Sequence, residues 1–369
     1  MRLLFDARYI RTDFHDGISR YSAELAAAVA AIAPERDVEV AYLIHDEAQR
    51  AFLPDGARAL RIHAPTAVRE PLTALVLNRY RPDAVFSPMQ TIGTLGRRFG
   101  LILTLHDTIY YRHRTPPRNL PWYVRVGWRL FHLSYVPQRL TLNAADTVAT
   151  VSETSAAEFA RVRLTTRPVV VIPNAPQRLA ELLPDGVGVE PGVENLVYMG
   201  SFMGYKNVET LIRAMAELPG RTLHLLSRIS DERRAELERL ADGRGGTVRF
   251  HNGVTDAEYA ALLADRAVLV SASLDEGYGL PVAEALALGV PAVVTDMPIF
   301  REVAGGGALY APGTDAAAFA AAVRELDDPV RRAAVIAAGT DHIARFSWER
   351  SANVLLDAVT RVAGVARGR

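Results

Sequence analysis

The sequence predicts an α/β protein of two domains, each built on a parallel sheet. Strand-like apolar runs alternate with alanine-rich helical stretches along the whole chain, as expected for parallel strands joined by crossover helices. The length, 369 residues, is too great for one ordinary α/β domain and suits two of about 150 to 200 residues. Residues 176–192 are rich in proline and glycine, which is typical of a linker, and we expect the domain boundary there.

Composition indicates a globular protein with ample core, because 49% of the residues are hydrophobic and 23% are charged. There are no cysteines, which excludes disulfides and thiolate metal sites. Asp6 interrupts the first apolar run, so we expect a buried strand there and not a signal peptide. No uncharged apolar run of about 18 residues occurs, which excludes a spanning helix. We therefore expect a cytoplasmic protein.

The net charge is zero, but the two halves of the chain differ in sign. Residues 1–178 hold 23 arginines and 16 acidic residues, whereas residues 179–369 hold 19 basic and 26 acidic residues. The positive first half suits an anionic partner or a membrane surface. Of the 42 basic residues 41 are arginine, and Lys206 is the one lysine.

The first half has strands and helices in regular order. A strand over residues 2–8 leads through a loop to a helix with Gly17 at its start, and three further strand-like runs follow. The buried run from Leu101 ends on His106 and Asp107, at the carboxyl end of the strand, where open α/β sheets bind ligands. A neutral imidazole there can position a hydroxyl through either nitrogen. The alternative is a structural, hydrogen-bonded His–Asp pair.

Residues 111–131 break this alternation with three prolines, five arginines and five aromatic residues. Arginine interleaved with tryptophan and tyrosine is typical of a segment at a membrane interface. The same mixture also binds sugars by stacking, or packs a long loop and helix without a ligand. All three roles stay open for this segment. Beyond it, we expect Ser152 to cap a helix that has Glu153 in its first turn.

The stretch from Leu269 to Asp296 has the most specific pattern in the second half. It predicts a short apolar strand to Ser271 and then a turn with two acidic residues and two glycines. A helix opened by Pro281 and closed at Gly289 follows, since proline at a first helical position and glycine just past the end are usual helix boundaries. A second apolar strand is expected over 290–295.

Two glutamates frame this turn and helix. Seven residues separate Glu276 from Glu284, so the first carboxylate lies in the turn and the second about one helical turn inside the helix. Both can face one ligand. The amides of residues 277–280 lie at the helix N-terminus, where free N–H groups and the helix dipole favour an anion such as phosphate. The alternative is an ordinary helix start with two solvated glutamates.

This stretch, E-GYGLPVA-E followed by ALALGVPAVVTD, closely resembles the E-x7-E signature of retaining glycosyltransferases of family 4. The resemblance covers nearly the whole chain, through HDGISRYSAEL, TLHD, GSFMGYKN, FHNGVTDAEY and the last helix FSWERSANVLLDAV. It implies the GT-B fold, α/β with two Rossmann-like domains facing across a cleft. It also implies an acceptor-side domain of residues 1–176, a nucleotide-sugar domain of residues 177–346, and a last helix, about 347–369, that packs back on the first domain.

The resemblance also implies site residues. Catalytic roles fall on His106, near the sugar and the acceptor, on Glu276, at the sugar hydroxyls, and on Lys206, at the donor diphosphate. Glu284 would bind the ribose hydroxyls, and amides near Gly17 would hold the diphosphate. The donor-binding set implied by the resemblance is Gly17, Ser201, Asn207, Asn252, Val254, Gly277, Tyr278, Gly279, Leu280 and Glu284.

One position departs from the family pattern. Many members place an arginine directly after the glycine of the turn that precedes Lys206, and this chain has Ser201 there. The leaving nucleoside diphosphate gains negative charge as the glycosidic bond breaks, so the chemistry asks for a cation. Neutralisation of the diphosphate then depends more heavily on Lys206, and Arg228 is a candidate for the missing cation.

The expected reaction needs neither metal nor cofactor. No two aspartates stand at positions i and i+2, so the D-x-D metal motif of GT-A enzymes is absent. In retaining enzymes of this type, the leaving phosphate takes the acceptor's proton, and no protein base is required.

The resemblance is nearest to bacterial mannosyltransferases of the O-antigen type, which favours GDP-mannose as the donor, with UDP-hexoses next. The expected acceptor is a glycolipid or a polysaccharide at the inner face of the membrane, with peripheral membrane contact through residues 111–131 as one alternative. No nucleic-acid partner is expected. The rival function is a catalytically degenerate binding protein of the same fold.

Overall fold

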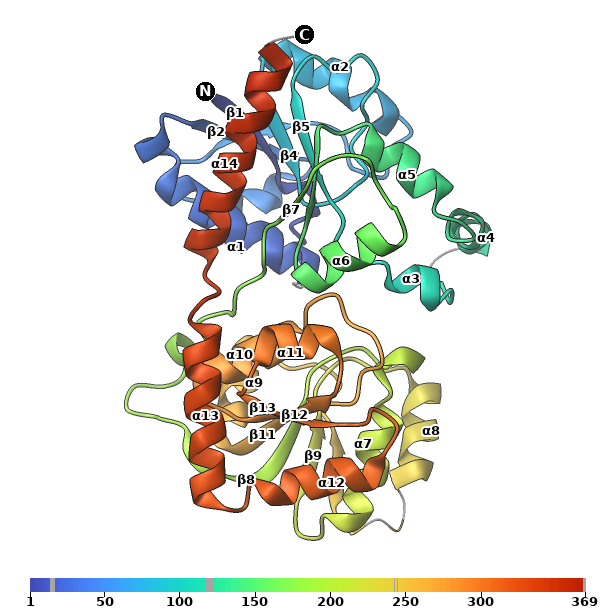
Figure 1. Ribbon diagram of the computed structural model, residues 1–369, viewed down its shortest axis with the longest axis vertical. Coiled ribbons are helices and arrows are strands. Elements are labelled where there is room, and N and C mark those ends of the chain that lie inside the picture. Colours follow the sequence, from blue (N-terminus) through green and yellow to red (C-terminus); the bar gives the residue numbers. More distant parts are fainter. Residues whose placement is uncertain (14–16, 117–121, 242, 244, 368–369) are drawn as a thin grey trace. The chain divides into compact units, whose positions relative to one another are not determined.

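A computed structural model describes residues 1–13, 17–116, 122–241, 243 and 245–367. The described chain forms two compact units. The first comprises Met1–Asn174 and the C-terminal segment from Ser347, and the second comprises Ala175–Phe346. Each unit is an α/β domain around one parallel sheet (Figure 1).

The sheet of the first unit has seven parallel strands in the order β3-β2-β1-β4-β5-β6-β7. Their bounds are β1 Arg2–Asp6, β2 Glu39–Ile44, β3 Arg58–Arg61, β4 Ala84–Ser87, β5 Gly100–Thr104, β6 Thr147–Thr150 and β7 Val169–Val171. The chain begins in the middle of the sheet, moves outward to β3, and continues from β4 on the other side of β1. The carboxyl ends of β1 and β4 therefore form the topological switch point, where open α/β sheets bind ligands.

The helices of the first unit are α1 Gly17–Ile32, α2 Thr73–Leu77, α3 Ile109–Arg112, α4 Trp122–Phe131, α5 Val136–Asn143, α6 Glu153–Arg161 and α14 Trp348–Arg367. Short 3₁₀ turns lie at Ala7–Tyr9, Pro34–Arg36, Glu47–Phe52, Glu70–Leu72 and Asn78–Tyr80. The predicted cap of α6 is confirmed, because Ser152 Oγ accepts the Ser155 N–H at 3.0 Å. The HDG motif before α1 falls partly on residues 14–16, outside the described residues.

The C-terminal helix α14 belongs to the first unit, where it packs on α1, β4 and β5 (Figure 1, red). Leu355, Leu356 and Val359 on this helix are fully buried. A Cβ on Gly100, at the start of β5, would lie 2.6 Å from the carbonyl oxygen of Val362. Glycine at this position therefore allows the helix to lie directly on the strand.

The sheet of the second unit has six parallel strands in the order β10-β9-β8-β11-β12-β13. Their bounds are β8 Glu190–Tyr198, β9 Thr222–Leu225, β10 Thr247–Phe250, β11 Asp265–Ser271, β12 Ala292–Thr295 and β13 Ala308–Ala311. The helices are α7 Val208–Ala214, α8 Asp231–Ala241, α9 Asp256–Ala264, α10 Leu280–Leu288, α11 Pro298–Ala304, α12 Ala316–Glu325 and α13 Pro329–Ile343, with 3₁₀ turns at Leu179–Leu182, Gly204–Lys206 and Met215–Glu217. The switch point of this sheet lies between the carboxyl ends of β8 and β11.

The segment expected as a linker, residues 176–192, contains a short 3₁₀ turn and the start of a strand. The 3₁₀ turn Leu179–Leu182 contacts α9 and α10, and Leu179 is buried. The strand β8 begins at Glu190, inside the expected linker. Proline and glycine therefore follow the end of the first unit here, but part of the segment packs on the second unit.

Candidate functional site

The two loops at the switch point of the second sheet bring two predicted catalytic residues together. Lys206 ends the 3₁₀ turn between β8 and α7, and Glu276 lies between β11 and α10. Lys206 Nζ donates to Glu276 Oε1 at 2.7 Å, and the two side chains are 16% and 14% exposed. A partly buried ion pair therefore stands where a ligand of an open α/β sheet is expected.

Asn207 joins these two loops. It has a left-handed backbone, with φ of 50°, and precedes the first residue of α7. Its Nδ2 donates to the carbonyl oxygens of Ala272 at 3.1 Å and Gly313 at 2.6 Å, and its Oδ1 accepts from Thr210 Oγ1 at 3.1 Å. These bonds hold the turn that carries Lys206 against the end of β11. The predicted role of Asn207 in donor binding stays a prediction, and the bonds observed here are structural.

Two hydrogen bonds to main-chain carbonyl oxygens fix the loop that carries Glu276. The Leu274 N–H donates to the Tyr205 carbonyl oxygen at 2.7 Å, which ties this loop to the residue before Lys206. The buried Ser273 donates through Oγ to the Asp275 carbonyl oxygen at 2.9 Å. The position of the ion pair is thus set by main-chain contacts on both sides.

The helix α10 follows the prediction closely. It begins one residue before Pro281 and ends before Gly289, which caps it in the left-handed conformation. Gly279, at the N-terminal boundary, has φ of 96°, and a Cβ there would lie 2.9 Å from Phe300 Cε1. Both the backbone angle and the close approach require glycine at this position. Glu284 is the fifth residue of the helix and only 5% exposed.

The residues of the turn directly before α10 are buried or half-buried. Gly277 and Tyr278 are buried, and the Tyr278 ring lies edge-on to Phe346, with 6.1 Å between the centroids. Burial raises the pKa of the Tyr278 hydroxyl well above its ordinary value. The side chain of this predicted donor-binding residue therefore packs the turn, and Leu280 is half-buried beside it.

Three neighbouring loops hold the remaining predicted residues. Ser201 is exposed, and its carbonyl oxygen accepts from the Tyr198 hydroxyl at 2.7 Å. Asn252 has a left-handed backbone, with φ of 59°, and its Oδ1 accepts the Ile229 N–H at 3.1 Å. Arg228 lies close to Gly253, because a Cβ on that glycine would lie 3.2 Å from Arg228 Cγ.

Val254 follows Gly253 in a half-buried position. A role for Arg228 as the missing cation stays a prediction.

In the first unit, His106 follows β5 and is held through Nε2. This nitrogen lies 2.9 Å from the Pro88 carbonyl oxygen, and the ring lies edge-on to Tyr21 at 5.2 Å. A carbonyl oxygen only accepts, so Nε2 carries a hydrogen. Asp107 Oδ1 accepts the Ile109 N–H at 2.9 Å and so caps α3. Gly17 is exposed and is the first residue of α1.

Sequence reasoning missed a buried ion network at the switch point of the first sheet. Arg8, 2% exposed, contacts Asp6 with Nε to Oδ1 at 2.8 Å and Glu70 with Nη1 to Oε2 at 2.8 Å. His63 Nε2 lies 3.1 Å from Glu70 Oε2. The available signal was an aspartate that ends an apolar strand with an arginine two residues later.

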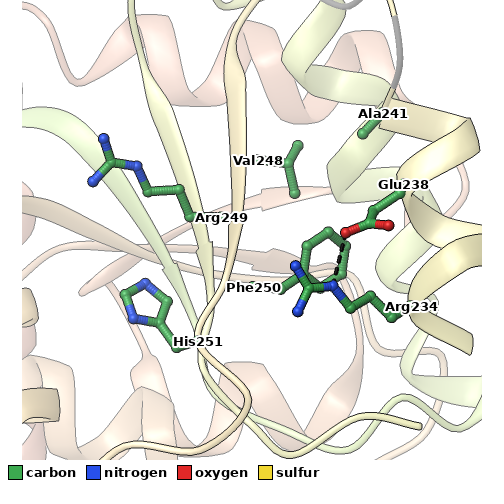
Figure 2. Close-up of a pocket in the computed structure, with 7 residues that line it drawn as sticks. All are labelled: Arg234, Glu238, Ala241, Val248, Arg249, Phe250 and His251. Atoms are coloured by element: carbon green, nitrogen blue, oxygen red, sulfur yellow. Dashed lines mark hydrogen bonds and ion pairs between the residues drawn. The ribbon is translucent and has the colours of Figure 1, made fainter. Parts of the chain in front are cut away.

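A histidine pair joins β9 to the residue that follows the edge strand β10. His224 Nδ1 lies 3.0 Å from His251 Nε2, and burial lowers the pKa of His224 to about 4. Figure 2 shows the adjacent groove between α8 and β10, of about 480 Å³, in which Arg234 lies across the Phe250 ring and pairs with Glu238. The predicted donor-binding residues Asn252 and Val254 do not line this groove.

Within the segment 111–131, residues 117–121 lie outside the described residues. The helix α4, described over its whole length, has no buried residue. Trp122 is 75% and Leu130 is 62% exposed. At about 100° per residue, these two, Tyr123 and Val126 fall within one arc of about 100°, with Arg129 at its flank. The arc is an exposed apolar stripe beside a positive charge.

The described residues contain neither a membrane-spanning helix nor a metal-binding cluster. No helix described here is long and apolar enough to cross a membrane. No group of three or more histidine, aspartate or glutamate side chains in the described chain is arranged to hold a metal ion. The expectation of a metal-independent reaction stays a prediction.

Two family profiles match the chain. The profile described as Glycosyl transferase 4-like domain matches residues 16–175. The profile described as Glycosyl transferases group 1 matches residues 185–341. Among curated proteins, the chain is similar to O-antigen chain mannosyltransferase B of Escherichia coli, with 28% identity over 233 residues. This match covers 59% of the chain and 61% of the relative, so the chain spans less than two thirds of the relative's length.

Solved structures share the fold over nearly the whole chain. Sucrose-phosphate synthase from Thermosynechococcus elongatus matches with a TM-score of 0.72 at 20% identity, covering 99% of each chain. A protein from Anabaena, solved in complex with UDP and glucose, matches with a TM-score of 0.70 at 17% identity, covering 98% of this chain and 100% of the other. At these identities the likeness shows the fold, and the predicted architecture of two Rossmann-like parallel sheets is confirmed.

Proposed function

This chain belongs to the family 4 glycosyltransferases of the GT-B fold, and from that premise we propose that it moves a hexose from a nucleotide sugar to a glycolipid or polysaccharide acceptor, with retention of configuration. The observation that supports this most directly is the Lys206–Glu276 pair at the switch point of the second sheet. The pair joins a cation suited to a diphosphate with a carboxylate suited to sugar hydroxyls.

When the donor binds, Lys206 and Glu276 each exchange their contact with the other for a contact with the donor. In the unliganded chain Lys206 binds Glu276. A bound nucleotide sugar brings its diphosphate to the ammonium group, and the released carboxylate accepts hydrogen bonds from the sugar hydroxyls. Glu284, buried in α10, is the acceptor for the ribose hydroxyls. Amides at the start of α10 add to the anion site, because a helix N-terminus favours negative charge.

The transfer step requires no protein base. The bond from the sugar C1 to the diphosphate oxygen breaks, and the acceptor oxygen forms its bond to C1 on the same face. The acceptor's proton passes to the leaving phosphate. Lys206 stabilises the negative charge that grows on that phosphate. His106 of the first unit helps to place the sugar and the acceptor.

GDP-mannose is the favoured donor because the chain is similar to an O-antigen chain mannosyltransferase. UDP-hexoses come next, since one structural neighbour was solved with UDP and glucose. The test is thermal unfolding with GDP, UDP, ADP or TDP, with a chelator present, in wild type and Lys206→Ala. A ligand at about a hundredfold excess over Kd adds roughly 2.7 kcal/mol to the unfolding free energy. Stabilisation by one diphosphate, lost in the variant, supports the proposal, and none by any diphosphate contradicts it.

A lipid-linked acceptor fits the exposed stripe on α4. Apolar side chains such as Trp122 and Leu130, beside Arg129, are suited to the surface of an anionic bilayer. The test is sedimentation with phosphatidylglycerol or phosphatidylcholine vesicles. We expect binding to the anionic vesicles only, weakened by salt and lost in Trp122→Ser/Leu130→Ser. The exposed Val68, outside the stripe, provides the control variant Val68→Ser. Equal sedimentation of all three proteins would contradict membrane contact through α4.

The rival function is a binding protein that has lost catalysis. It predicts stabilisation by a nucleoside diphosphate without release of sugar from any nucleotide sugar. The presence of His106, Lys206 and Glu276 together favours the enzyme.

A further inference from the structure

A second ion pair lies at the same edge of the second sheet as Lys206 and Glu276. Arg233 is the third residue of α8, the helix that follows β9, and Glu209 is the second residue of α7, the helix that follows β8. Arg233 Nη2 donates to Glu209 Oε1, and Arg233 Nη1 lies 2.7 Å from Glu236 Oε2. Both helices begin at the carboxyl ends of parallel strands, where open α/β sheets bind ligands.

Arg233 has an unfavourable place in its helix. A cation in the first turn meets the positive end of the helix dipole, which favours anions. The side chain is only 19% exposed, so its charge has also lost most of its contact with water. By contrast Arg239, in the last turn of α8, is exposed and lies at the end that favours a cation. Residues that break such local rules are typical of functional sites.

Tyr198, the last residue of β8, shows that this pair lies near the proposed donor site. Its hydroxyl donates to the Ser201 carbonyl oxygen at 2.7 Å, in the turn between β8 and α7. Burial raises the pKa of this hydroxyl well above its ordinary value. The charges of Glu276 and Glu209 raise this pKa further, whereas that of Arg233 lowers it. Charges from both ion pairs therefore act on one buried hydroxyl group.

A diphosphate needs more positive charge than Lys206 supplies. A nucleoside diphosphate has more negative charge than one ammonium group neutralises, and its charge grows as the glycosidic bond breaks. Among residues 199–207, all of them described, Lys206 is the only cation. A guanidinium is suited to this task, because its parallel N–H groups bind two phosphate oxygens at once.

We infer that Arg233 is a second cation for the diphosphate and that it exchanges Glu209 for phosphate oxygens when the donor binds. In the unliganded chain Glu209 and Glu236 balance its charge. The inference rests on the proposed glycosyl transfer and deepens it, since it gives the donor site a residue from a third loop of the sheet.

The test is calorimetry of the full chain with GDP and UDP, and with guanosine and uridine, which have no phosphate. Arg233→Gln should weaken binding of the diphosphate about tenfold, because it removes a charged hydrogen-bond donor and leaves two glutamates near the ligand. Binding of the matching nucleoside should stay unchanged. The control is Arg239→Gln, which removes an exposed guanidinium from the other end of the same helix and should change neither affinity.

Glu209→Gln separates a phosphate contact from a structural bridge between α7 and α8. This variant removes the competitor of the diphosphate, so it should bind the diphosphate at least as tightly as wild type. A structural bridge would instead make Glu209→Gln and Arg233→Gln equally harmful, because both break the same contact. If Arg233→Gln does not fold, the comparison of Glu209→Gln with wild type decides the inference.

Three results overturn the inference. One is diphosphate binding by Arg233→Gln equal to that of wild type, in particular where Lys206→Ala loses binding, and this result leaves the proposed function intact. Another is equal weakening by Arg233→Gln and Glu209→Gln. The third is weakening by Arg228→Gln with none by Arg233→Gln, which would assign the second cation to Arg228. A wild-type chain that binds no nucleoside diphosphate contradicts the proposed function and the inference together.

Discussion

Replacing Lys206 with methionine removes the charge and keeps much of the aliphatic stem. The variant leaves Glu276, whose side chain is 14% exposed, without its partner at 2.7 Å. Exposed ion pairs contribute about 0–1 kcal/mol, whereas breaking a buried pair costs about 3–5 kcal/mol. This pair lies between those limits, so we expect Lys206→Met to lower the unfolding free energy by about 2 kcal/mol.

A double-mutant cycle isolates the interaction. Glu276→Gln should have a similar cost, and the variant with both changes should be about as stable as either single variant, which corresponds to a coupling energy of about 2 kcal/mol in urea unfolding. Arg178→Met is the control, because it breaks an exposed pair with Glu181 and should cost no more than about 0.5 kcal/mol. Additive effects of the Lys206 and Glu276 substitutions would refute the pair.

The same variants should differ in nucleotide binding measured by calorimetry. Hydrogen bonds to charged groups contribute about 1.5–3 kcal/mol, and each 1.4 kcal/mol is about tenfold, so Lys206→Met should weaken nucleoside diphosphate binding about 10- to 100-fold. Glu276→Gln removes the competitor of the diphosphate, and this variant should bind at least as tightly as wild type. Equal weakening by both substitutions would refute the exchange of partners at Lys206.

Three further predictions concern the glycines of α10, the glycine at the start of β5, and a histidine with a lowered pKa. Gly289→Ala should cost about 1 kcal/mol, because its φ of 83° strains an alanine in open space, whereas Gly279→Ala should cost more and weaken diphosphate binding, because its Cβ also meets an aromatic ring. Urea unfolding and calorimetry of the two variants would contradict this if their effects were equal. Gly100→Ala should destabilise the first unit by about 1–3 kcal/mol through overpacking against α14, and unchanged thermal unfolding would show that the helix does not lie on β5 in solution. The pKa of His224 is lowered to about 4 in the folded chain and is about 6.5 when unfolded, so the unfolded state takes the proton first and the unfolding free energy should fall by at most about 3 kcal/mol as pH drops from 6.5 to 4. His224→Asn should flatten this loss in urea unfolding at pH 7 and 4.5, and an unchanged slope would contradict the assignment.

Local signals predicted local structure well. Pro281 and Gly289 marked the ends of α10 because both act through the backbone of a single residue. Ser152 marked the start of α6 for the same reason. Strand limits were less accurate: β11 extends back to Asp265, where pairing with β8 shifts register, and no feature of the apolar run indicates that partner.

Contacts between distant residues were beyond sequence reasoning. Asn207 was expected at the donor, yet its amide bonds residues 65 and 106 positions away, which only the fold brings near. Arg8 likewise meets Glu70 across 62 positions. The Tyr278 ring is buried edge-on to Phe346, and the glycines on either side of it in the sequence do not indicate where the ring points.

The central claim is that Lys206 and Glu276 form the donor site of a metal-independent, retaining glycosyltransferase. The most direct measurement is the release of free sugar from GDP-mannose and UDP-glucose by the full chain, with a chelator and without acceptor, compared with Lys206→Ala. We predict slow hydrolysis of one donor by wild type, with the sugar first released in the anomeric configuration that it had in the donor, and loss of this hydrolysis in the variant. Hydrolysis that is absent with both donors, or equal in the variant, would contradict the account.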